Sequence, residues 1–116
     1  MATVLPELKS LMSPDLPEGQ EPAEPADAAA LFDAEIGPKD LKGAEVFSFV
    51  AITPRALARD HGARWGRGYL ILDTVSWSSV RSALQTLLLR CGAETWNGVA
   101  TKLSREMHWE FEDYRE

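Results

Sequence analysis

The sequence has one cysteine, two histidines and no long apolar run. A single cysteine, Cys91, cannot form an intrachain disulfide, and it excludes a zinc site built from several cysteines. There is no basic-then-apolar N-terminal signal and no stretch of about 18 apolar residues, so we expect a soluble, unprocessed, cytoplasmic protein with no membrane partner. What the chain does have is 45% hydrophobic residues, four of them tryptophan, which is enough for one compact domain over residues 1–116.

Sequence motifs of catalysis are also missing. The glycines between residues 62 and 68 have the wrong spacing for either nucleotide-binding loop and enclose arginine and tryptophan. No serine elbow occurs, and no cysteine–histidine pair has a recognisable spacing. Cys91 lies on an apolar helical stripe, which favours a buried thiol over a nucleophile. We therefore predict that the protein is not an enzyme and has no catalytic, cofactor-binding or metal-binding residues.

Charge is divided unevenly along the chain. The net charge is −6 for residues 1–43, +4 for residues 44–105 and −4 for residues 106–116. Acidic ends argue against a nucleic-acid partner and favour a cationic one. The alternative is that the ends are merely solvated, or neutralise the basic middle within the same molecule.

Four segments have the residue patterns of strands. Residues 29–36 alternate between an apolar face and a mixed one, which predicts a strand with one wet side, whereas residues 45–52 are apolar on both faces and should lie centrally. Their short connection predicts an antiparallel hairpin. The predicted strands are Glu7–Met12, Ala29–Ile36, Glu45–Ile52 and Tyr69–Thr74, the last a buried strand at the centre of the core. Between the first two, residues 13–27 combine four prolines with five acids and are predicted to be a mobile acidic loop.

Three segments have helical spacing. Thr53-Pro54 is typical of a helix start, and Ser76 and Gly92 are predicted to cap the two ends of the longest helix. The predicted helices are Pro54–His61, Trp77–Cys91 and Thr95–Glu106. We therefore expect an α+β fold, in which an antiparallel sheet of three to four strands has the two main helices packed on one face and the short extra helix at an edge.

Three groups of residues are candidates for binding a partner. Asp33 and Glu35 belong to the wet side of the second strand. Trp65 lies between two arginines in a loop, and these residue types are frequent among interface hot spots, although a tryptophan tucked against the sheet is the alternative. The third group is the C-terminal run Trp109, Glu110, Glu112, Asp113 and Tyr114, for which a binding role and a folding role are both open, because aromatics near a terminus often pin it to the body.

Several motifs along the chain resemble one known family. They are Ile36-Gly37-Pro38-Lys39 with Gly43 and Phe47, Ile52-Thr53-Pro54 with Leu57, Gly68-Tyr69-Leu70-Ile71, Thr95-Trp96 with Val99-Ala100 and Lys102-Leu103, and Trp109-Glu110-Phe111-Glu112-Asp113-Tyr114. Together they look like the immunity protein 8 family of bacterial polymorphic toxin systems. The similarity runs from Ser13-Pro14-Asp15 to Tyr114, and the terminal run is its most specific element.

The resemblance implies a small α+β protein that binds a cognate toxin domain in the cytoplasm and blocks it stoichiometrically. If the toxin is a nuclease, its substrate site is basic, and an acidic inhibitor surface would occupy that site in place of phosphates. A different class of function remains as the alternative, namely a non-catalytic structural or adaptor module that assembles through an exposed sheet edge.

Overall fold

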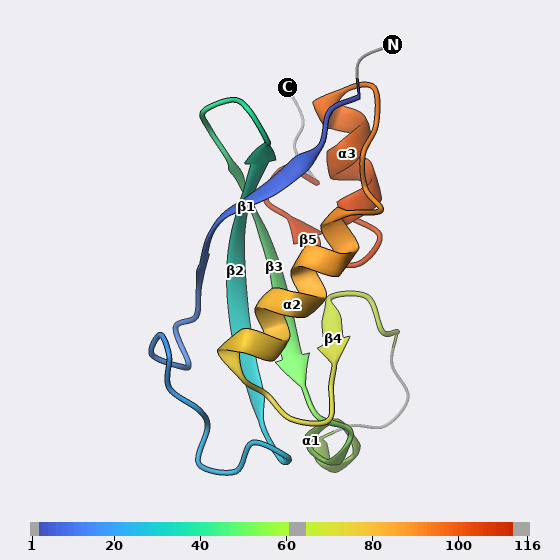
Figure 1. Ribbon diagram of the computed structural model, residues 1–116. Coiled ribbons are helices and arrows are strands. Elements are labelled where there is room, and N and C mark those ends of the chain that lie inside the picture. Colours follow the sequence, from blue (N-terminus) through green and yellow to red (C-terminus); the bar gives the residue numbers. More distant parts are fainter. Residues whose placement is uncertain (1–2, 61–64, 113–116) are drawn as a thin grey trace.

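The computed structural model describes residues 3–60 and 65–112. In this part of the chain, five strands form one sheet and three helices accompany it (Figure 1). The strands are β1 (Pro6–Met12), β2 (Ala29–Pro38), β3 (Glu45–Ile52), β4 (Tyr69–Ile71) and β5 (His108–Trp109). The helices are α1 (Pro54–Asp60), α2 (Trp77–Leu88) and α3 (Trp96–Leu103). The predicted α+β class is confirmed.

The sheet is mixed rather than purely antiparallel. Strands β1, β2 and β3 pair antiparallel in chain order, so the predicted hairpin between β2 and β3 is confirmed. Beyond β3, its C-terminal half pairs with β4 in parallel and its N-terminal half pairs with β5 antiparallel. The expectation of antiparallel pairing was wrong for β4, because the chain crosses through α1 after β3 and returns to run in the same direction.

The expected position of β4 was also wrong. Instead of a buried central strand over Tyr69–Thr74, β4 spans Tyr69–Ile71 and ends the strand order β1-β2-β3-β4. Ile71 is 54% exposed. The apolar residues that suggested a buried strand belong to an edge strand, which pairs with β3 alone. Residue type was therefore a poor guide to how deeply this strand is buried.

The helix starts agree with the predictions better than the helix ends do. The Ser76 side chain accepts a hydrogen bond from the backbone of Ser79, and Thr95 accepts one from Gly98. However, α2 ends at Leu88 instead of Cys91, and its C-cap, Leu89, has a right-handed conformation, so Gly92 is not the left-handed stop. Helix α3 likewise ends at Leu103, three residues before the predicted Glu106.

The core lies between one face of the sheet and the two longer helices (Figure 1). The ring of Phe32 stacks on Phe49 at 5.8 Å and meets the indole of Trp77 edge-on at 5.1 Å. The buried face of α2 consists of Trp77, Val80, Leu84 and Leu88. Ala30, Phe32, Ala34 and Ile36 are all buried, while the residues between them, Leu31, Asp33 and Glu35, are partly exposed, which confirms the predicted alternation. The helices therefore leave the opposite face of the sheet uncovered.

The acidic loop over residues 13–27 has no helix or strand, as predicted, but it is attached to the body. Leu16 is buried in the core, and the indole of Trp77 donates to the carbonyl of Pro17 at 2.9 Å. The carboxylate of Asp27 forms an ion pair with Arg59 at 2.6 Å. The mobility of this loop stays a prediction. Any large motion of the loop would have to break the contacts of Leu16, Pro17 and Asp27 with the body.

Candidate partner-binding surface

The uncovered face of the sheet, called the open face below, carries the side chains that alternate with the core residues. Ser48 of β3 lies opposite Asp33 of β2 on one side and His108 of β5 on the other. The strand registers place the following side chains on this face: Ser10, Met12, Leu31, Asp33, Glu35, Val46, Ser48, Val50, Tyr69 and His108. Met12 and His108 are exposed, and the side chains between them are half-buried. The open face is thus an apolar and acidic surface with a histidine at one border.

Asp33 and Glu35 are held in place on the open face by serine hydroxyls. The hydroxyl of Ser48 donates to Asp33 at 2.6 Å, and that of Ser10 donates to Glu35. Within the described residues, no lysine or arginine forms an ion pair with either carboxylate. A neutral hydroxyl fixes the position of a carboxylate without cancelling its charge. Both predicted candidates therefore present negative charge from fixed positions.

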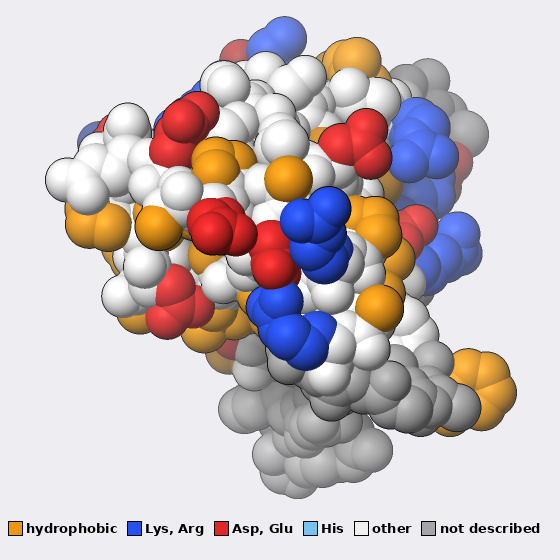
Figure 2. Space-filling view, turned by 90° about the horizontal axis from the view of Figure 1, so that it is seen from below, with side chains coloured by type: hydrophobic (Ala, Val, Ile, Leu, Met, Phe, Trp, Pro, Cys, Tyr) orange, Lys and Arg blue, Asp and Glu red, His pale blue; other side chains and the backbone are white. Residues whose placement is uncertain are grey.

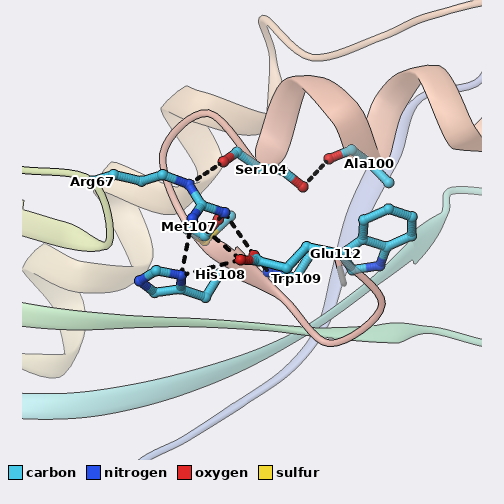
Figure 3. Close-up of polar contacts among 7 residues, drawn as sticks. All are labelled: Arg67, Ala100, Ser104, Met107, His108, Trp109 and Glu112. Atoms are coloured by element: carbon cyan, nitrogen blue, oxygen red, sulfur yellow. Dashed lines mark hydrogen bonds and ion pairs between the residues drawn. The ribbon is translucent and has the colours of Figure 1, made fainter. Parts of the chain in front are cut away.

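Arg67 binds the C-terminal segment to the rest of the molecule (Figure 3). Its guanidinium donates to the carbonyls of Ser104 and Met107 at 2.7 and 3.0 Å, and to both carboxylate oxygens of Glu112, the closer at 2.6 Å. It also contacts Nδ1 of His108 at 3.1 Å. We call Arg67, His108 and Glu112 the tail clasp. The hydrogen bond from Arg67 is the main reason that the pKa of Glu112 falls from 4.5 to about 2.

The aromatic and acidic residues before Glu112 also contribute to folding. The indole of Trp109 stacks on Phe47 at 6.3 Å and donates to Oε1 of Glu45 at 3.0 Å. Trp96 of α3 donates to the same oxygen at 2.7 Å. A side-chain oxygen of Glu110 accepts from the backbone N–H of Val46 at 2.5 Å. Trp109, Glu110 and Glu112 therefore all hold the tail on the sheet, whereas Asp113 and Tyr114 lie outside the described residues.

Trp65 differs from the other tryptophans. Its side chain is 93% exposed, so it is not tucked against the sheet. The indoles of Trp77, Trp96 and Trp109 each donate a hydrogen bond, to Pro17 in the first case and to Glu45 in the other two. Trp65 has no hydrogen bond or ring contact within the part of the chain that the structure describes.

The sequence identified most of the candidate residues, but it did not identify the side chains that hold them in place. Glu45 was not a candidate, although it joins two indoles, and Arg67 was considered only for recognition. Ser48 is the one partner with a usable signal, because a hairpin register places it opposite Asp33. The tail clasp had none, since Arg67 and Glu112 are 45 positions apart.

The charge of the open face is not repeated at the end of the molecule near α1. Figure 2 shows that end, where acidic, basic and apolar side chains are intermixed. Arg59 of α1 is paired there with Asp27. The described residues at this end therefore present no surface of a single charge.

The described residues contain no group of three or more histidine, cysteine, aspartate or glutamate side chains placed to hold a metal ion. Cys91 is buried as predicted, and burial raises the pKa of its thiol, which keeps it protonated and weakly nucleophilic. None of the helices in the described ranges has the length and apolar character to cross a membrane.

The α+β fold by itself does not assign a function, which has to be argued from the site. The site here is an uncovered sheet face with carboxylates fixed by serine hydroxyls, which are features of a protein-binding surface. A family model narrows this assignment. The model described as Immunity protein 8 matches residues 6–114, and the chain belongs to that family. The predicted family is confirmed, and the chain is an immunity protein of a polymorphic toxin system, from a family of non-catalytic inhibitors that bind a cognate toxin. No curated protein and no solved structure matches it.

Proposed function

We propose that this protein binds its cognate toxin domain in the cytoplasm through the open face and blocks the toxin's active site in a one-to-one complex. The observation that carries this proposal is the pair Asp33 and Glu35, whose carboxylates are fixed by Ser48 and Ser10 and lack an ion-pair partner among the described residues. Fixed charges lose little side-chain entropy on binding, so more of their attraction to a partner is retained.

The charge of this surface indicates the chemistry of the toxin. Carboxylates on a sheet face attract a basic partner, steer its approach and repel acidic ones. A nuclease has such a basic surface where it holds phosphates. We propose a nuclease as the toxin, with Asp33 and Glu35 occupying positions that substrate phosphates would take. An assay of the isolated toxin on DNA and RNA tests this step, and a toxin that cleaves neither overturns it.

The alternative function, an adaptor module that assembles through an exposed sheet edge, is disfavoured at the edge formed by β1. Pro6 lacks an N–H to donate, and the pairing of β1 with β2 is irregular between Leu8 and Ser10. Lys9 forms an ion pair with Glu7 on this strand at 2.9 Å. Proline, charge and a bulge are the features that natural sheets use to prevent edge-to-edge pairing.

The test of the open face is the double substitution Asp33→Asn and Glu35→Gln. Amide oxygens still accept from Ser48 and Ser10, so the fold is retained while two charges are lost. We expect binding to the toxin domain to weaken about 10-fold or more, mainly through slower association, and growth rescue in co-expressing cells to fall in parallel. The matched control is Asp73→Asn with Glu94→Gln, two exposed acids outside the open face.

The outcomes separate clearly. A dissociation constant that changes equally in the open-face and control variants means that overall charge matters and the open face does not. An unchanged dissociation constant, at unchanged thermal stability, removes Asp33 and Glu35 from the interface. Competition between this protein and the toxin's substrate is expected for an active-site block, and simultaneous binding of both would contradict it.

A further inference from the structure

The feature that the open face does not explain is Trp65. An indole exposes a large apolar area to water at a cost in free energy, and the other tryptophans of this chain avoid that cost by packing and hydrogen bonding. Tryptophan is also among the residue types most enriched at interface hot spots. Folding gives no reason for the 93% exposure of Trp65, whereas binding does.

The turn that follows Trp65 is attached on two sides. The carbonyl of Gly68 accepts from Val50 of β3 at 2.8 Å, and its N–H donates to Glu106 at 3.0 Å. Arg67, two residues after Trp65, is held by the tail clasp and by two backbone carbonyls. The backbone that follows Trp65 is therefore fixed before binding, so less backbone entropy is lost when the indole is immobilised in a complex.

This turn also borders the open face. Gly68 has a φ of +88° and lies so close to His108 that a Cβ there would be 2.5 Å from the ring. His108 is opposite Ser48, whose hydroxyl bonds to Asp33. Asp33 and His108 are two strands apart, about 10 Å at the usual strand spacing. The turn that carries Trp65 therefore adjoins the His108 border of the surface that carries the carboxylates.

We propose that Trp65 is the apolar anchor of the toxin complex. Its indole enters an apolar pocket of the toxin, located at the border of the basic surface that meets Asp33 and Glu35. This inference rests on the proposed function and adds the shape of the partner: a basic surface with an apolar pocket about 10 Å or more from the nearest contacted cation. A second copy of the chain is a poor partner for this surface, because two open faces in contact would place carboxylates of like charge against each other.

The test is Trp65→Ala, measured by titration of the toxin domain with the purified protein. Hot-spot residues are defined by a loss of about 2 kcal/mol on truncation, so we expect about 30-fold weaker binding, at 1.4 kcal/mol per tenfold. Trp65→Phe keeps an aromatic ring and should recover part of the affinity. Leu89→Ala is the matched control, because Leu89 is 85% exposed at the end of α2 and belongs to a different part of the surface.

Thermal unfolding is measured for each variant, and Trp65→Ala is expected to leave it unchanged, because the Trp65 side chain is 93% exposed. A second readout is quenching of tryptophan fluorescence by acrylamide. The exposed indole should dominate quenching in the free protein and become protected in the complex, and Trp65→Ala should remove most of that protected fraction.

The possible results distinguish the two proposals. If Trp65→Ala binds as tightly as the natural protein while Asp33→Asn with Glu35→Gln binds weakly, the anchor is wrong and the open face stands. If Trp65→Ala alone weakens binding, the anchor stands and the carboxylates are not required. A change in the oligomeric state of Trp65→Ala with no change in toxin affinity assigns the indole to self-association and overturns the anchor. Failure of the natural protein to bind the toxin overturns both.

Discussion

Replacing Glu45 by alanine should destabilise the fold more than any other single loss of a carboxylate in the described part of the chain. One oxygen of Glu45 accepts hydrogen bonds from the indoles of Trp96 and Trp109, at 2.7 and 3.0 Å. Both indoles also pack on Phe47, one edge-on and one stacked. The carboxylate therefore joins α3 to the C-terminal tail across the first residue of β3.

The magnitude follows from the number and kind of bonds lost. A hydrogen bond to a charged group contributes about 1.5–3 kcal/mol, and water compensates in part here because Glu45 and both indoles are half-buried. We expect Glu45→Ala to lower the free energy of unfolding by about 2–3 kcal/mol. For a chain of this length, about 1 kcal/mol corresponds to about 4 °C in Tm, so the expected decrease is about 8–12 °C.

The measurement is thermal and urea unfolding, followed by near-ultraviolet circular dichroism. Glu45→Gln keeps an acceptor oxygen and should lose about 1 kcal/mol, or about 4 °C. Glu94→Ala removes an exposed glutamate for comparison and should stay within about 0.5 kcal/mol of the natural protein. The reasoning is refuted if Glu45→Ala and Glu94→Ala are equally stable.

Two further predictions concern stability. Glu112→Gln should lower the free energy of unfolding at pH 7 by about 1 kcal/mol. The fall of the Glu112 pKa from 4.5 to about 2 means that the folded state stabilises the ionised carboxylate, and the expected loss is reduced because this side chain is partly solvated. The difference from the natural protein should disappear as pH falls from about 4.5 to about 2, and a difference that stays constant in urea titrations over this range would contradict it. Thr53→Val should cost about 2 kcal/mol in urea unfolding, because the buried hydroxyl accepts from Ala28 and Ala56 at 3.1 and 3.3 Å. Thr53→Ser, which keeps the hydroxyl and removes the methyl group, should lose less than half as much, and equal losses would show that the methyl group contributes as much as the hydroxyl.

Local patterns in the sequence were sufficient to predict those strands and helices whose buried face follows from the spacing of their own apolar residues. The alternation from Ala30 to Ile36 places Asp33 and Glu35 on the open face, and the register of the hairpin does not alter that assignment. Thr53-Pro54 and Ser76 begin helices because capping needs one hydroxyl and one nearby N–H. These signals act within a few residues, so they can be read without knowing the rest of the fold.

Features that depend on where distant segments meet could not be predicted in this way. The direction of β4 depends on the path of the chain through α1, and the tail clasp depends on Arg67 meeting a segment 45 positions later. After Leu88 the backbone bonds tighten, with Arg90 donating to the carbonyl of Leu87 and Cys91 to that of Leu88, so α2 ends before Gly92 is reached. Trp65 is the clearest case for the candidate site, because an apolar residue type by itself favours burial, and only the fold shows that this indole faces water.

The sharing of one β3 edge by β4 and β5 has a consequence during synthesis. Half of that edge is filled by His108 and Trp109, and Trp109 lies 64 positions after Glu45, the first residue of β3. Until they emerge, the N-terminal half of β3 lacks its neighbour, and Phe47 and Glu45 lack the Trp109 indole. This half of the β3 edge therefore forms only after the whole stretch from β3 to Trp109 has been synthesised. A chain that stops before His108 leaves the N-terminal half of β3 unpaired on that side, while β4 still fills the C-terminal half.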